Sequence, residues 1–133
     1  MTEQNLKTAN HKILVVDDDD AVRFAMQTAL EFEGYEVFTA ENGQAALDFL
    51  QHAPRPCVIL LDLMMPVMDG WTFALQLEKD EKLADIPIVV VSAFGDQAQT
   101  INAKTIFKKP VNLKELFATV KKWCADNGGI IHG

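Results

Sequence analysis

Short apolar runs that end abruptly in polar residues constrain the fold of this chain more than any other feature. The clearest run is residues 57–61, five apolar residues rich in branched side chains, and Asp62 ends it. Such a run is too short for a helix and is typical of a strand buried on both faces. A carboxylate that follows a buried strand must find a cation or stay ionised where water is scarce, and both conditions suit chemistry better than packing.

The residues after Asp62 predict that the chain leaves this strand through a loop. Pro66 excludes a continuing helix or central strand, and Asp69 followed by Gly70 supplies turn-forming residues. A simpler interpretation, in which Asp62 only caps a turn, stays open at this point because Asp is common in turns.

A second apolar run, residues 13–16, also ends in carboxylates, since four acids occupy positions 17–20. We assign Asp19 and Asp20 to capping of the following helix, because Asp is favoured at helix starts. Four adjacent acids are more than one cap can use. Asp17 and Asp18 lie nearest the strand end and are therefore further site candidates.

Strands and helices alternate five times along the chain. Strands are predicted at 13–16, 35–39, 57–61, 88–91 and 105–107, and helices at 20–33, 44–52, 71–79 and 112–124, with a weak helix at 97–103; Gly128 and Gly129 are expected to close the last helix. This alternation predicts an α/β fold, a three-layer sandwich with a parallel sheet and helices on both faces.

In an open parallel sheet, ligands bind beyond the carboxyl ends of the strands, where the strand order reverses. The flavodoxin-like order 2-1-3-4-5 reverses between strands 1 and 3, which end in Asp17, Asp18 and Asp62. Ser92 ends the fourth strand and Lys109 follows the fifth, so both should lie on the same edge. Five polar groups from four distant segments thus converge on one rim.

Three neighbouring carboxylates repel one another, and a hard divalent cation with oxygen ligands relieves that repulsion. A carboxylate can also attack a phosphoryl group to give an aspartyl phosphate, a transfer that depends mainly on positioning and charge neutralisation. Mg2+ and Lys109 would neutralise the phosphoryl oxygens, and the Ser92 hydroxyl would hydrogen-bond one of them.

Length and charge exclude several function classes. The 133 residues fit one domain, with an N-terminal arm at 1–11, a folded region at 12–125 and a loose tail at 126–133. A net charge of -7 argues against a nucleic-acid-binding surface. The sequence contains neither an apolar run that could span a membrane nor a secretory signal, so we expect a cytoplasmic protein. Cys57 and Cys124 lie far apart and are expected to be two unrelated reduced thiols.

These residues resemble the receiver domain of two-component response regulators over about residues 12–125. The motifs that carry the resemblance are Val16-Asp17-Asp18, Leu60-Leu61-Asp62 with Met65-Pro66 and Asp69-Gly70, Val91-Ser92-Ala93, and Lys109-Pro110. The resemblance implies a phosphoacceptor domain that receives its phosphoryl group from a sensor histidine kinase or a histidine phosphotransfer protein. It is expected to catalyse only its own phosphorylation and dephosphorylation, and to alter contacts with an unknown downstream protein without an output domain of its own.

Carried over residue by residue, the resemblance implies that Asp62 is the phosphoacceptor. Mg2+ or Mn2+ would be held by Asp17, Asp18, Asp62 and the backbone carbonyl of Met64; Ser92 would be the switch hydroxyl and Lys109 the phosphate-binding lysine, with Pro66, Gly70 and Pro110 supporting the loops.

Two departures from the family pattern stand near the end of the chain. Ile106 occupies a position where many receivers have an aromatic residue that moves with the switch hydroxyl. The interval from Ser92 to Lys109 is 109 minus 92, or 17 positions, which is short for the family. The helix between the fourth and fifth strands is therefore expected to be short or absent. The surface that most receivers use for output is expected to be altered as a result.

Two other functions remain open from the sequence. A small phosphohydrolase of the haloacid-dehalogenase kind would use Asp17 as nucleophile and Asp19 as acid, but this interpretation gives Asp62 no clear role. A receiver-like binding domain that works without phosphorylation would leave the five site residues unexplained.

Overall fold

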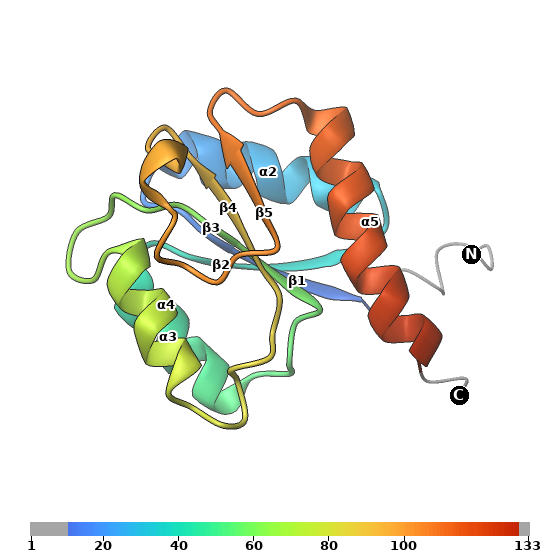
Figure 1. Cartoon of the computed structure of the whole chain (residues 1–133). Coiled ribbons are helices and arrows are strands. Elements are labelled where there is room, and N and C mark those ends of the chain that lie inside the picture. Colours follow the sequence, from blue (N-terminus) through green and yellow to red (C-terminus); the bar gives the residue numbers. More distant parts are fainter. Residues whose placement is uncertain (1–10, 131–133) are drawn as a thin grey trace.

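Five parallel strands form one sheet in the order β2-β1-β3-β4-β5. The computed structural model describes residues 11–130, the last five as backbone only (Figure 1). The strands are β1 (Lys12–Val16), β2 (Glu36–Ala40), β3 (Val58–Leu61), β4 (Ile88–Ser92) and β5 (Thr105–Lys108). The predicted sheet type, strand order and doubly wound topology are confirmed.

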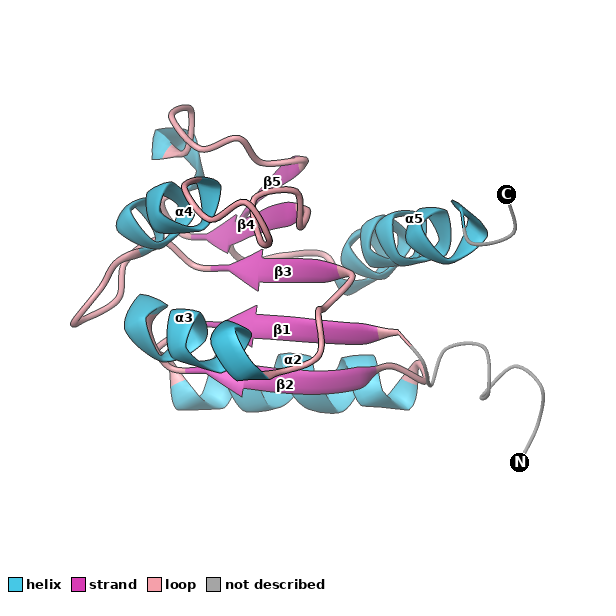
Figure 2. Cartoon of the chain, turned by 90° about the horizontal axis from the view of Figure 1, so that it is seen from below, coloured by secondary structure: helices cyan, strands magenta, loops and turns pink. Residues whose placement is uncertain are grey.

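In the described part of the chain, four α-helices cover the two faces of the sheet. They are α2 (Asp20–Phe32), α3 (Gly43–His52), α4 (Gly70–Glu78) and α5 (Leu113–Ile130). The helices α3 and α4 lie on one face, and α2 and α5 lie on the other (Figure 2). The chain therefore has the three layers that the sequence predicts.

Two separate apolar cores fill the space between the sheet and its helices, because successive strand residues point to opposite faces. In β1, Leu14 and Val16 pack on the side of α3 and α4. Ile13 and Val15 pack on the side of α2 and α5. This burial on both faces explains why the strands are continuous apolar runs rather than alternating ones.

The helix starts follow the capping signals in the sequence. Asp19 accepts a hydrogen bond from the backbone N–H of Val22 at 3.0 Å, as its assignment to capping requires. Asn112 accepts one from Glu115 N at 3.0 Å, at the predicted start of the last helix. Each side chain satisfies a backbone donor that the helix itself leaves unpaired.

The predicted helix at 97–103 is wrong. Between β4 and β5 the structure has only a three-residue 3-10 helix, η1 (Gly95–Gln97). The expectation that the helix between these two strands is short or absent is therefore confirmed. The hydrogen bonds here span three residues, from Ala98 N to Gly95 O and from Ile101 N to Ala98 O, so the segment folds as successive tight turns.

The C-terminal boundary also differs from the prediction, since α5 continues to Ile130 through Gly128 and Gly129. Glycine costs a helix only about 1 kcal/mol relative to alanine and does not by itself end one. The expected loose tail at 126–133 is therefore helical as far as residue 130, while residues 131–133 and positions 1–10 of the expected arm lie outside the described residues.

The expectation of two unrelated thiols is wrong. Cys57 and Cys124 form a disulfide with a Cα–Cα distance of 5.1 Å across 67 sequence positions. Cys57 immediately precedes β3, and α5 lies at the amino ends of the strands (Figure 2), where Cys124 meets Cys57. Sequence separation alone could not reveal this contact, because the direction of the last helix produces it.

None of the helices in the described part of the chain has the length and apolar character that a membrane crossing requires.

The single tyrosine permits a clean test of the packing at the start of β2. Burial, with a smaller contribution from the charge of Glu33, raises the pKa of Tyr35 above its ordinary value of 10.0. The folded state therefore holds the phenolic proton more tightly than the unfolded state, and stability falls as pH rises above about 10. We expect the absorbance change of phenolate formation to occur at a higher pH in native protein than in urea.

A native midpoint equal to that in urea would contradict this packing. Tyr35→Phe supplies the control, because it should abolish the absorbance change and leave the fold intact.

Candidate functional site

The carboxyl edge of the sheet positions two aspartates by extending the strand ladder. Asp17 follows β1 and donates its backbone N–H to Ala40 O at 3.1 Å, while Asp62 follows β3 and donates its N–H to Val16 O at 2.9 Å. Both residues are buried. The reversal of strand order between β1 and β3 therefore places two carboxylates side by side, as the sequence predicts.

Asp18 joins these two residues as the third carboxylate. One carboxylate oxygen from each of Asp17, Asp18 and Asp62 lies within 4.8 Å of the others. Asp18 is exposed, so the group opens to solvent on one side. A set of three hard oxygen donors that is partly buried and partly open fits a divalent cation that keeps some of its water.

Lys109 reaches this group from the same carboxyl edge of the sheet, where it follows the outermost strand, β5. Its backbone N–H donates to Ser92 O at 3.0 Å, which extends the β4–β5 ladder by one residue. Its Nζ then lies 2.8 Å from Asp17 Oδ2 and 3.3 Å from Asp62 Oδ2. One ammonium group thus bridges the two buried carboxylates.

The second oxygen of each buried aspartate is held by the backbone. Asp17 Oδ1 accepts from Asp19 N at 2.9 Å, and Asp62 Oδ1 accepts from Leu63 N at 2.7 Å. These bonds fix the rotation of both carboxylates, so that each turns its Oδ2 toward Lys109. The orientation of the acids is therefore set before any ligand arrives.

The charge balance of the cluster is negative. Burial raises the pKa of Asp17 above its ordinary value, although the Lys109 hydrogen bond opposes this. Burial alone would lower the pKa of Lys109, but its hydrogen bond to Asp17 and the charges of Asp17 and Asp62 outweigh burial and raise it. With all groups ionised, three carboxylates and one ammonium carry -3 + 1, or -2, which one divalent cation would neutralise.

Ser92 lies at the end of β4 with its side chain fully buried. Its Oγ accepts a hydrogen bond from Phe94 N at 3.1 Å. Because the oxygen acts as the acceptor in this bond, the hydroxyl can still donate its own hydrogen. The structure places Ser92 beside Lys109 through the backbone, as expected.

The loop from Leu63 to Gly70 is closed tightly at its base. Gly70 donates its N–H to Leu63 O at 2.8 Å, and a Cβ at Gly70 would overlap with the backbone oxygen of Asp62. Pro66 O accepts from Met68 N at 2.7 Å inside the loop. Gly70 is thus required by close backbone approach, which supports its predicted role in the loop.

The structure adds backbone detail at Val67 and Pro110, and shows the exposure of Met64. Val67 has a φ of 69°, an uncommon conformation for a branched residue, and sequence reasoning gave no signal for it. Met64 lies in the same loop with its side chain half exposed, and the metal-binding role of its carbonyl stays a prediction. Pro110 follows Lys109 through a cis peptide bond.

Sequence reasoning missed Arg23. Its Nη1 donates to the backbone oxygen of Asp17 at 2.7 Å, and its Nη2 pairs with Asp20. The side chain therefore fastens the acidic loop to the first turn of α2. The only available signal was the spacing of three residues between Asp20 and Arg23, which favours an ion pair on a helix.

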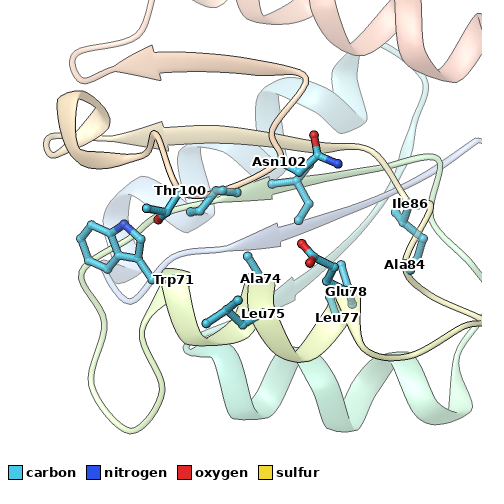
Figure 3. A pocket seen from close by; sticks show the side chains of 11 residues that line it. Trp71, Ala74, Leu75, Leu77, Glu78, Ala84, Ile86, Thr100 and Asn102 are labelled. Atoms are coloured by element: carbon cyan, nitrogen blue, oxygen red, sulfur yellow. The ribbon is translucent and has the colours of Figure 1, made fainter.

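A hollow of about 100 Å3 lies apart from this acidic edge, between α4 and the turns that connect β4 to β5 (Figure 3). Trp71 stands at one end of it and donates its indole N–H to Gln97 O at 2.8 Å. This contact of Trp71 is structural. The hollow contains none of the residues predicted for the site.

A doubly wound parallel sheet with a lysine-bridged cluster of aspartates at its topological switch point defines a class of regulatory α/β domains. A family model described as the response regulator receiver domain matches residues 13–121, and the chain belongs to this family.

Two curated relatives illustrate the range of the match. The chain is 35% identical over 121 residues to sporulation initiation phosphotransferase F of Bacillus subtilis (strain 168), covering 86% of this chain and 94% of that protein. It is 38% identical over 115 residues to the probable transcriptional regulator ycf27 of Galdieria sulphuraria, covering 83% of this chain and 44% of that protein. The chain thus spans about half the length of the first curated relatives it matches.

Solved receiver structures share the fold. The chemotaxis response regulator CheY4 of Vibrio cholerae has a TM-score of 0.76 and 30% identity, covering 85% of this chain and 98% of that chain. The response regulator TrrA of Thermotoga maritima, in complex with Mg2+-BeF, has a TM-score of 0.75 and 33% identity over the same shares.

Proposed function

We propose that this chain is a phosphoacceptor in which Asp62 receives a phosphoryl group in a reaction that requires Mg2+ or Mn2+. The donor would be a phosphohistidine on a sensor kinase or on a phosphotransfer protein. The observation that carries the proposal is the bridging of Asp17 and Asp62 by Lys109, because it places a cation beside the carboxylate that would react. Structures of receiver domains with bound magnesium support the choice of metal.

The roles follow from the contacts described above. An oxygen of Asp62 attacks the phosphorus, and the bond from phosphorus to the donor nitrogen breaks. Lys109 can stay close to Asp62 and neutralise a phosphoryl oxygen, while the free hydrogen of Ser92 donates to another. Asp17 and Asp18, with the Met64 carbonyl, would hold the metal, which when bound supplies positive charge to the phosphoryl oxygens.

A phosphoryl group at Asp62 would draw Ser92 and Lys109 toward it, and both residues belong to the β4–β5 side of the sheet. The change would therefore be read at that side by another protein. With η1 in place of a full helix, the readout surface would include the exposed side chains of Phe94 and Ile106.

Intact mass after incubation with acetyl phosphate and Mg2+ tests the proposal. We expect one phosphoryl adduct in the native chain, none in Asp62→Asn, and none after the metal is chelated. An adduct that survives Asp62→Asn but requires Asp17 would support the dehalogenase-like hydrolase instead.

If no adduct forms, a beryllofluoride titration separates the remaining possibilities. Spectral shifts at the carboxyl edge would indicate a receiver that refuses small donors, whereas no shift would support a phosphorylation-independent binding domain.

An apolar surface beside the site suits the docking of a donor protein. Val22, Ala25 and Met26 of α2 face Pro110, Val111 and Leu113 across a depression of about 450 Å3 that Lys109 also lines. A donor seated here would stand next to the bridged carboxylates. Contact with this surface would add affinity through burial of apolar area.

Ala25→Glu places a charge on this exposed surface without touching the aspartates. We expect phosphotransfer from a histidine kinase that phosphorylates the native chain to slow at least about tenfold, because a buried unpaired charge costs more than 1.4 kcal/mol. Phosphorylation by acetyl phosphate should not change. Gln51→Glu adds the same charge on α3, on the other face of the sheet, and should leave both rates unaltered.

A further inference from the structure

The disulfide connects the segment before β3 to helix α5. Cys57 lies in the segment before β3, and its backbone N–H donates to Lys12 O at 2.8 Å. Cys124 lies in the described C-terminal half of α5. The bond is therefore at the amino end of the sheet, opposite the acidic edge, and the phosphoacceptor proposal does not involve it.

Helix α5 rests on the sheet through a row of buried residues, with Phe117 and Trp123 partly buried against the same core. Among its residues up to position 125, only Leu116, Val120 and Cys124 are buried, at intervals of four. Cys124 is the last of these three, so the disulfide fixes the C-terminal half of the helix to the sheet. Figure 2 shows α5 at the amino ends of the strands.

The residue next to Cys124 indicates that this end of the helix packs imperfectly. Trp123 Nε1 is buried and has no hydrogen-bond partner among the described residues. Lys104 and Lys122 each place their Nζ 5.3 Å from the centre of the Trp123 ring. A buried donor without a partner is costly, which favours an alternative seating of the helix once the covalent bond is gone.

The two sulfur-bearing residues differ in access. Cys124 has no exposed surface, whereas Cys57 is partly exposed. Thiol–disulfide exchange begins with the attack of a thiolate on an accessible sulfur. An external thiol can therefore approach Cys57, and Cys124 would be the leaving group.

We propose that Cys57–Cys124 is a reversible dithiol–disulfide switch that clamps the C-terminal half of α5 to the sheet when oxidised and releases it when reduced. The thiolate of a dithiol reductant attacks Cys57 Sγ, the Sγ–Sγ bond breaks, and the Cys124 thiolate takes up a proton. The second thiol of the reductant then attacks the mixed disulfide. This step releases the reductant as a disulfide and returns Cys57 as a thiol. A small disulfide reverses the two steps and re-forms the Cys57–Cys124 bond.

Amide hydrogen exchange with and without dithiothreitol tests the switch, with alkylation mass to count free thiols. We expect two thiols to appear in folded protein and exchange in residues 113–125 to accelerate about tenfold or more, while β1 and β3 stay protected. The melting temperature should fall by roughly 10–20 °C, because the cross-link restricts a long loop of the unfolded chain.

Two variants keep the test decisive. Cys57→Ser changes the partly exposed partner and should reproduce the fast exchange of α5 without responding to dithiothreitol. In Cys124→Ala, glutathione disulfide should modify Cys57 in the folded protein, because Cys57 is partly exposed.

Three results would overturn the proposal. They are a bond that reduces only after denaturation, two thiols that persist in an oxidising glutathione buffer, and unchanged exchange in α5 after reduction. None of these results depends on phosphorylation of Asp62, so failure here would leave the proposed function untouched.

Discussion

Gly70→Ala is expected to destabilise the domain by about 3 kcal/mol or more and to abolish formation of the phosphoryl adduct. The added methyl group would overlap with the backbone oxygen of Asp62 and lie 2.8 Å from Leu63 Cα. Neither is the end of a flexible side chain, so the backbone itself would have to move, and overpacking of this kind costs about 1–3 kcal/mol or more. The displaced backbone belongs to the proposed phosphoacceptor.

Urea unfolding measures the first effect and intact mass after acetyl phosphate treatment measures the second. Gly95→Ala is the matched control, because its new methyl group would meet the Ile106 side chain at 3.2 Å, which can yield. Equal stability of the two variants would contradict the close approach at Gly70.

Lys109→Met should have the second large effect, because it removes the cation that Asp17 and Asp62 share. Breaking a buried ion pair costs about 3–5 kcal/mol, but Lys109 keeps 23% of its side chain exposed, so we expect about 1–3 kcal/mol at neutral pH. Added Mg2+ should restore part of this loss, since a divalent cation would neutralise the same carboxylates.

The pH dependence of the Lys109 contribution has a definite sign. Its pKa is raised in the folded state, so the stabilisation is fully present below about 10.5 and is lost as pH rises through the folded value. The difference in unfolding free energy between the native chain and Lys109→Met should therefore shrink at high pH.

Lys108→Met supplies the control for the neighbouring lysine. Lys108 pairs with Asp96 at 2.9 Å, but both side chains are exposed, and such surface pairs contribute about 0–1 kcal/mol. If Lys108→Met cost as much as Lys109→Met, the special role of the bridging lysine would be refuted.

The site was largely predictable because each component directly follows an apolar strand. Asp62 after residues 57–61 and Asp17 after 13–16 needed only the rule that parallel strands end at one edge. The alternation of helices and strands indicated a doubly wound parallel sheet, but the order 2-1-3-4-5 came from the flavodoxin-like pattern and not from the alternation itself. Local sequence and global topology agree at these positions, which makes such inference reliable.

The remaining features depend on geometry that sequence spacing does not encode. The disulfide follows from the return direction of α5, and the contact of Arg23 with Asp17 O follows from how α2 leaves β1. The segment at 97–103 contains helix-compatible residues, yet tight turns carry it back until Lys104 N reaches Ile88 O at 2.8 Å. In each of these cases, tertiary contacts determine a local structure that the intrinsic propensities of the residues do not determine.

The bond between Cys57 and Cys124 divides the chain into a covalent ring and the two linear segments that precede and follow it. Asp62, Ser92 and Lys109 lie within the ring, whereas Asp17 and Asp18 lie on the segment before it. A protease cut between the two cysteines would leave the resulting pieces joined, but a cut between Asp18 and Cys57 would break the covalent link from Asp17 and Asp18 to Asp62. In the oxidised protein, the acidic site is therefore assembled from the ring and from the linear segment that precedes it.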